Sequence, residues 1–159
     1  MNAGARVAGG DVLLFLHVDT ILPEGADLMI EVAICGRCRV WGRFDVEIRG
    51  RPWMLRVVAA LMNWRSRITG IATGDQAIFV ARSAFESVGG FPDQPLMEDI
   101  ELCKRLRVLS RPACLHARAV TSGRRWESRG VLRTIVLMWR LRWAYWRGVP
   151  ASVLADRYE

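Results

Sequence analysis

Apolar and polar residues alternate along this chain in two ways, as short apolar runs and as stripes with helical spacing. The run at 11–17 follows two glycines and predicts a strand buried on both faces, as in a parallel sheet. Similar patterns predict further strands at 40–48, 76–81 and 113–121. Helical spacing predicts helices at 23–34, 53–64, 83–88, 98–108 and 131–147. Strands that alternate with helices in this way predict an α/β domain.

Length and composition fit one globular domain. The 159 residues are 52% hydrophobic and 25% charged, which excludes disorder as the default. The net charge of +7 comes almost wholly from arginine, since Lys104 is the single lysine. Such a charge is typical of a solvated basic surface, or of a surface that binds a nucleotide diphosphate, an anionic lipid or a nucleic acid.

The cysteines and the N-terminal residues indicate the cellular compartment in which the protein is expected. The spacing of Cys35 and Cys38 permits half a zinc site or a redox pair, but Cys103 and Cys114 do not form the second close pair that a zinc site needs. The spacing therefore favours four reduced cysteines and a cytoplasmic protein. The N-terminus lacks the pattern of a signal peptide, and no apolar run reaches the roughly 18 residues of a membrane span.

Two candidate sites contain carboxylates. Asp19 follows the predicted strand at 11–17, and the carboxyl ends of strands are where α/β sheets bind ligands, although a turn would also accept Asp19. Mg²⁺ or Mn²⁺ typically takes one or two carboxylates there, together with substrate phosphates. Glu98 and Asp99 begin a predicted helix, where they either complement the helix dipole or supply a general base whose pKa the neighbouring acid raises.

Two further candidates lie in predicted loops. Asp75 and Gln76 follow Gly74 and suit hydrogen bonding to a polyol, or an ordinary turn. The sequence Arg124-Arg-Trp126 precedes the last long helix. Its arginines suit a leaving diphosphate and its tryptophan suits stacking on a ring, although a plain basic loop has the same composition.

In their order along the chain, these segments resemble family 2 glycosyltransferases, and most closely a bacterial branch described as radical-SAM/selenodomain-associated. The resemblance spans nearly the whole chain. The matching motifs are Phe15-Leu-His-Val-Asp19, Gly42-Arg-Phe-Asp45, Thr69-Gly-Ile-Ala72, Gly74-Asp-Gln76, Gly89-Gly-Phe-Pro92, Pro95-Leu-Met-Glu-Asp99 and Arg124-Arg-Trp126.

The resemblance implies a Rossmann-like GT-A fold that binds a nucleotide-diphosphate sugar and Mg²⁺ or Mn²⁺. It implies that 1–159 is the C-terminal two-thirds of one such domain, without the N-terminal nucleotide-binding portion and with a Trp- and Arg-rich helix at 131–147. The activity implied is inverting transfer of a sugar to an acceptor hydroxyl. Asp99 matches the catalytic base and Asp19 the metal ligand. Matching the substrate-binding positions are His17, Asp75, Gln76, Glu98, Arg124, Arg125 and Trp126.

Other interpretations remain open. The chain could be a catalytically inactive, truncated remnant, or a basic nucleic-acid-binding module, although its scattered arginines disfavour nucleic acid as a partner. If the N-terminal portion is missing, the strand at 11–17 lacks the strand that would pair with it. The open sheet edge would then favour self-association, and the activity would be weak. The helix at 131–147 is expected to pack mainly against protein, while its tryptophans and arginines also suit a peripheral contact with the inner face of a membrane.

Overall fold

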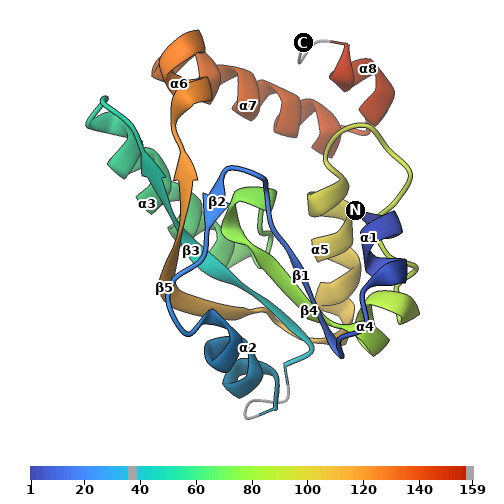
Figure 1. Ribbon diagram of the computed structural model, residues 1–159. Coiled ribbons are helices and arrows are strands. Elements are labelled where there is room, and N and C mark those ends of the chain that lie inside the picture. Colours follow the sequence, from blue (N-terminus) through green and yellow to red (C-terminus); the bar gives the residue numbers. More distant parts are fainter. Residues whose placement is uncertain (36–38, 157–159) are drawn as a thin grey trace.

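The computed structural model describes residues 1–35 and 39–156. It shows a mixed α/β domain, as the pattern of the sequence predicted. Its five-stranded sheet curls strongly into half a barrel with the order β1-β4-β3-β5-β2 (Figure 1). The strands are β1 (Val12–Phe15), β2 (Thr20–Ile21), β3 (Trp41–Arg49), β4 (Ile78–Ala81) and β5 (Ala113–Ser122).

The strand directions differ from those expected. Only β3 and β5 run parallel among the described strands, while β1, β4 and β2 pair antiparallel with their neighbours. The expectation of a parallel-sheet strand at 11–17 is therefore wrong, since β1 pairs antiparallel with β4. β1 lies at the edge of the sheet, and Leu13 is its one fully buried residue. A short apolar run fits such an edge strand because both of its faces still contact protein side chains.

The predicted helices are present with shifted ends. Helix α2 begins at Ala26 rather than at Pro23, and α3 continues to Thr69. The short elements α1, β2, α6 and α8 were not predicted, because each has six residues or fewer and shows no period. The helices are α1 (Asn2–Val7), α2 (Ala26–Cys35), α3 (Met54–Thr69), α4 (Arg82–Ser87), α5 (Glu98–Leu109), α6 (Arg124–Arg129), α7 (Val131–Trp146) and α8 (Ala151–Ala155), with a 3₁₀ turn η1 (Gly74–Gln76).

Alternating side chains on β1 and β4 fill a core on each face of the sheet. Leu13 and Val80 belong to a cluster that contains residues of α4 and α5. Phe79, which points to the opposite face, packs in a second cluster with Ile30 of α2. Helices therefore cover both faces, with α2 on one side and α4 and α5 on the other (Figure 1).

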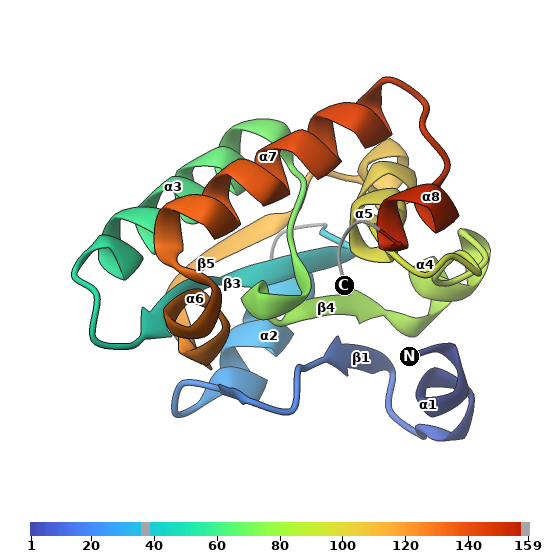
Figure 2. The same ribbon diagram turned by 90° about the horizontal axis from the view of Figure 1, so that it is seen from above.

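Two long helices, α3 and α7, pack around the far end of β3. Leu55 and Val58 of α3 share a hydrophobic cluster with Val46 of β3, and Val131 and Ile135 of α7 pack against that cluster. Figure 2 shows α7 running beside α3 above β3 and β5. In the described part of the chain no helix has the length and apolar character needed to cross a membrane.

One side chain of α3 takes the place of a strand beside β3. β4 pairs with β3 only at Trp41 and Gly42. Farther along that edge, the Asn63 side chain accepts a hydrogen bond from the Val46 N–H (2.8 Å) and donates one to the Val46 carbonyl (3.0 Å). Both polar groups of a buried backbone unit are thereby satisfied, and α3 is fixed to the sheet.

An ion network lies between β3 and α3. Asp45 accepts two hydrogen bonds from the Arg67 guanidinium (2.8 and 2.9 Å) and also pairs with Arg43, whose side chain is 1% exposed. Arg67 additionally bonds the His116 ring (2.8 Å). The network sits where the pairing of β3 with β5 shifts its register after Phe44. A buried arginine with a carboxylate partner explains why the Gly42–Asp45 segment carries charges inside a strand.

Candidate functional site

Separate segments of the chain converge beyond the carboxyl end of β1. His17 and Asp19 are exposed in the loop that follows β1, and Asp75 lies in η1. The His17 imidazole lies against Gly74 so closely that a Cβ atom on Gly74 would overlap it. The glycine is therefore what allows the two segments to approach each other.

Asp99 joins η1 to the first turn of α5. Its Oδ2 accepts a hydrogen bond from the Gly74 N–H (3.1 Å), and its Oδ1 accepts one from the adjacent Ile100 N–H (2.7 Å). Burial raises the pKa of Asp99 to about 6, and the negative charges of Glu98 and Asp75 act in the same direction, against the two backbone hydrogen bonds. The carboxylate is thus fixed in position and close to the pKa that a general base needs near neutral pH.

Asp75 links the remaining charges of the cluster. Burial raises the pKa of Asp75, and the Asp19 carboxylate adds to this effect, while the His17 imidazole and the Arg125 guanidinium oppose it. These interactions place His17, Asp19 and Arg125 within electrostatic range of one carboxylate. The site therefore joins the loop after β1, η1 and α6, and Asp99 adds the start of α5.

The raised pKa of Asp99 leads to a prediction that needs no substrate. The ¹³C resonance of its carboxyl carbon should titrate with a midpoint near pH 6, well above the value of about 4 in an unfolded chain. Between these two values the native state binds the extra proton, so Asp99 should lower the free energy of unfolding as the pH rises from about 4 to 6. A midpoint at or below about 4 would contradict the burial of this carboxylate.

Sequence reasoning missed Arg65, which α3 directs toward Asp99. Burial lowers the pKa of Arg65, and the opposing charge of Asp99 is the largest effect that raises it. Its Nη2 atom is buried and has no hydrogen-bond partner within the described part of the chain. No feature of the sequence distinguishes Arg65 from the other arginines of α3, since its interaction with Asp99 joins two segments that are far apart in the chain.

Some of the candidate residues lie outside the cluster. Gln76 is fully buried, and its amide donates to Ser66 Oγ (3.1 Å) and Asn63 Oδ1 (3.2 Å), which anchors η1 to α3. Trp126 packs against the hydrophobic cluster below α3, and Arg124 bonds the Ser122 hydroxyl (3.2 Å). The buried Gln76 and the packed Trp126 therefore stabilise the scaffold, whereas Arg124 is an exposed side chain next to Arg125 and stays a predicted substrate contact.

The carboxylates fit a metal ion only with help from a bound molecule. Over residues 1–35 and 39–156, no group of three His, Cys, Asp or Glu side chains is arranged to hold a metal ion. Asp19 is exposed and interacts with Asp75, so the site offers hard oxygen ligands of the kind that Mg²⁺ and Mn²⁺ prefer. A divalent ion at Asp19 would draw most of its remaining ligands from phosphate oxygens and water.

None of the three cysteines that the structure describes has a recorded interaction with Asp19 or Asp75, and Cys103 is a buried thiol. Burial raises the pKa of Cys103 to about 12, so its thiol stays protonated, and its Sγ accepts a hydrogen bond from the Ala72 N–H (3.4 Å). Cys35 is an exposed free thiol and Cys114 is half-buried. Cys38 lies outside the described residues, so the Cys35–Cys38 pair cannot be placed.

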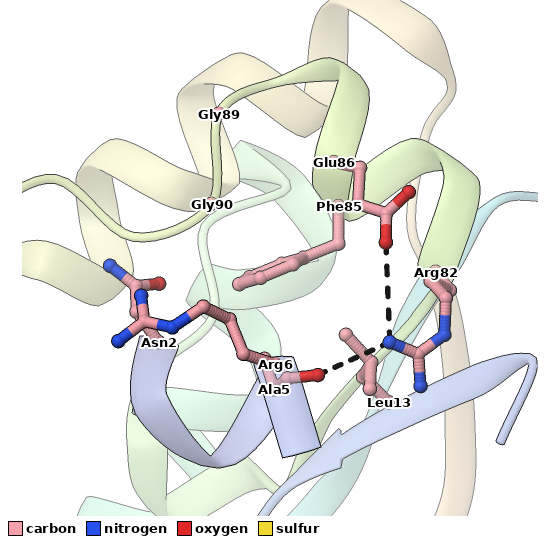
Figure 3. Close-up of a pocket in the computed structure, with 9 residues that line it drawn as sticks. All are labelled: Asn2, Ala5, Arg6, Leu13, Arg82, Phe85, Glu86, Gly89 and Gly90. Carbon is pink, nitrogen blue, oxygen red and sulfur yellow. Dashed lines mark hydrogen bonds and ion pairs between the residues drawn. The ribbon is translucent and has the colours of Figure 1, made fainter. Parts of the chain in front are cut away.

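A surface hollow of about 370 Å³ lies elsewhere, beside α1 (Figure 3). Its lining contains none of the candidate site residues. The Arg82 guanidinium on its wall donates to the carbonyls of Ala5, Ala8 and Gly10, and Figure 3 also shows its contact with Glu86. Because these bonds tie α1 and the residues after it to the start of α4, the hollow belongs to the packing of the N-terminal helix.

Comparison with known proteins adds no assignment to this geometry. A scan against protein-family models finds no match, and a search among curated proteins finds none either. The function of the chain therefore has to be argued from its own residues, of which His17, Asp19, Asp75, Asp99 and Arg125 form the candidate site.

Proposed function

We propose that the chain is a GT-A-type inverting glycosyltransferase, which moves a sugar from a nucleotide-diphosphate donor to an acceptor hydroxyl. The observation that carries the proposal is Asp99, a carboxylate held by two backbone hydrogen bonds with a pKa of about 6. It lies in one charged cluster with Asp75, Asp19 and Arg125. The ordered motifs that resemble family 2 glycosyltransferases include the segments that carry Asp19, Asp75 and Asp99.

The reaction requires a base on one side of the sugar and positive charge on the other. Asp99 is mostly ionised at neutral pH and accepts the proton of the acceptor hydroxyl. The hydroxyl oxygen then forms a bond to the anomeric carbon as the bond from that carbon to the diphosphate oxygen breaks. Attack opposite the leaving group inverts the anomeric configuration. The half-buried Arg65, whose positive charge interacts with Asp99, would stabilise the ionised form of the base.

The opposite end of the cluster suits the diphosphate. Asp19 and His17 are exposed beyond β1, and Arg125 supplies a guanidinium that binds phosphate oxygens. A divalent ion held by Asp19 would neutralise charge on the departing diphosphate. Asp75 and Glu98, whose charges both act on Asp99, would accept hydrogen bonds from sugar hydroxyls on the acceptor side.

Replacing Asp19 with asparagine should abolish metal-dependent binding of nucleoside diphosphates. The exposed carboxylate is the proposed metal ligand, and few other acidic groups adjoin it. Titration calorimetry with UDP and with GDP, each with and without MnCl₂, measures the effect. The matched control is Asp27→Asn, which changes an exposed carboxylate on α2 and should bind as the parent chain does.

The outcome separates three interpretations. Manganese-dependent affinity that is lost only in Asp19→Asn supports the assignment. Binding without any sugar transfer by the parent chain would indicate a non-catalytic remnant. Equal affinity of Asp19→Asn and the parent chain would overturn the metal site.

A further inference from the structure

Exposed tryptophans gather on two neighbouring helices. The chain has seven tryptophans, of which Trp41 is buried and Trp126 half-buried. The other five are between 60% and 78% exposed, and all of them lie on α7 or on α3 and the residue before it. They are Trp53, Trp64, Trp139, Trp143 and Trp146.

Exposed aliphatic residues continue the same stripes at helical spacing. Val57, Leu61 and Ile68 lie between or beyond the tryptophans of α3, and Leu132 and Val136 precede those of α7. We call these ten residues the Trp face. Large apolar side chains in such a number are unusual on a protein surface without a binding role.

The buried sides of both helices are already occupied. α3 packs inward through Leu55 and Val58, and α7 through Val131 and Leu141. The expectation that the apolar stripe of α7 packs against protein is therefore wrong for Leu132, Val136 and the three tryptophans. The side of α7 that packs against protein is the one with Val131 and Leu141, and nothing in the described part of the chain covers the Trp face.

The charged residues of α3 and α7 themselves are all arginines. Neither α3 nor α7 contains an aspartate or glutamate. Arg56 of α3 and Arg133 and Arg140 of α7 are exposed. Arg147, directly after α7, stacks over the Trp143 ring with its guanidinium carbon 4.8 Å from the centroid. The complementary surface is therefore apolar and anionic together.

An anionic lipid bilayer supplies both properties at the required depths. Its hydrocarbon boundary buries aliphatic side chains, its interface accommodates tryptophan rings, and its phosphates attract arginine. A single-stranded nucleic acid would stack on the tryptophans and pair with the arginines, but would leave Leu61, Ile68 and Leu132 in water. The aliphatic share of the Trp face thus favours lipid.

We propose that the Trp face of α3 and α7 docks the protein on the surface of an anionic bilayer. The helices lie in the plane of the interface, with the Trp face in the headgroup region and the arginines at the phosphates. This inference does not depend on the proposed transferase activity. It does link the bilayer surface to the proposed active site, because α3 carries both the exposed Ile68 of the Trp face and Arg65, which interacts with Asp99.

Vesicle flotation with the full chain tests the proposal. Vesicles of phosphatidylcholine with about 30% phosphatidylglycerol should bind the protein at low salt, and binding should weaken as salt screens the arginines. Trp139→Ala combined with Trp143→Ala should reduce the partition coefficient at least tenfold, and Arg133→Gln with Arg140→Gln should remove the preference for anionic lipid. On binding, the tryptophan fluorescence of the parent chain should shift to shorter wavelength.

The matched control replaces exposed apolar residues outside the Trp face. Ile21→Ala combined with Val108→Ala changes side chains that are 65% and 86% exposed on β2 and α5, and it should bind vesicles as the parent chain does. Thermal unfolding should be the same in all variants, since every changed residue is exposed. Absence of vesicle binding at low salt, equal loss in the control, or a stable dimer that shields these tryptophans without lipid would overturn the proposal.

Discussion

Replacing Asp99 with asparagine should lower sugar transfer by about 10²- to 10⁴-fold, the usual contribution of a general base. The amide cannot accept the proton of the acceptor hydroxyl, yet it keeps the size of the carboxylate. Turnover is measured as the release of UDP or GDP from UDP-glucose and GDP-mannose, with water as the slow acceptor. Affinity for UDP and GDP should remain unchanged, because Asp99 lies on the acceptor side of the proposed site.

Two controls separate the base from its neighbour. Glu98→Gln removes the adjacent charge that helps to raise the pKa of Asp99, and it should shift the pH profile downward with a small loss of rate. The parent rate should rise with pH through about 6 as Asp99 loses its proton, and the residual rate of Asp99→Asn should lack this rise. A severe effect of Glu98→Gln beside a mild effect of Asp99→Asn would assign the base to Glu98.

Replacing Asp45 with alanine should lower the free energy of unfolding by about 3–5 kcal/mol, the usual cost of removing one partner from a buried ion pair. The Arg43 side chain is 1% exposed, and without Asp45 its charge would be buried beside that of Arg67. Urea unfolding followed by circular dichroism measures the loss. Because the charged partners of Asp45 are Arg43, Arg67 and His116 rather than residues of the proposed site, the effect should appear in stability before it appears in nucleotide affinity.

The matched control for Asp45 is on the same strand. Glu47→Ala removes a carboxylate whose side chain is 41% exposed and which pairs with Arg118 (3.5 Å) and Arg49 (3.8 Å) at the surface. Such exposed pairs contribute about 0–1 kcal/mol. Similar losses of stability in Glu47→Ala and Asp45→Ala would show that the network around Asp45 is not effectively buried.

The sequence predicts the long elements of this fold well and their arrangement poorly. The helices at 98–108 and 131–147 and the strands at 40–48 and 113–121 agree with α5, α7, β3 and β5 within a few residues. Each of these has enough residues to show a period. The direction of strand pairing depends on contacts between distant segments. The seven-residue apolar run at 11–17 therefore could not predict how β1 pairs or that it lies at the edge of the sheet.

The residues of the candidate site could likewise be predicted from the sequence only in part. His17, Asp19, Asp75 and Asp99 are polar residues at the ends of predicted elements, and their order along the chain singles them out. Whether such a residue faces the cluster depends on packing. Gln76 adjoins Asp75 in sequence, yet the short turn of η1 directs it into the protein toward α3, where Ser66 and Asn63 occupy its amide.

The side chain of Asn63 couples parts of the molecule that would otherwise move separately. It bonds the N–H and carbonyl of Val46 on β3, and its Oδ1 also accepts a hydrogen bond from the side-chain amide of Gln76 in η1. Lifting α3 from the sheet would expose the edge of β3 and release η1, which carries Asp75 and the Gly74 N–H that orients Asp99. Motions of α3 and of the proposed base should therefore share one energetic barrier, so that local unfolding of this helix and loss of the competent site occur as a single event.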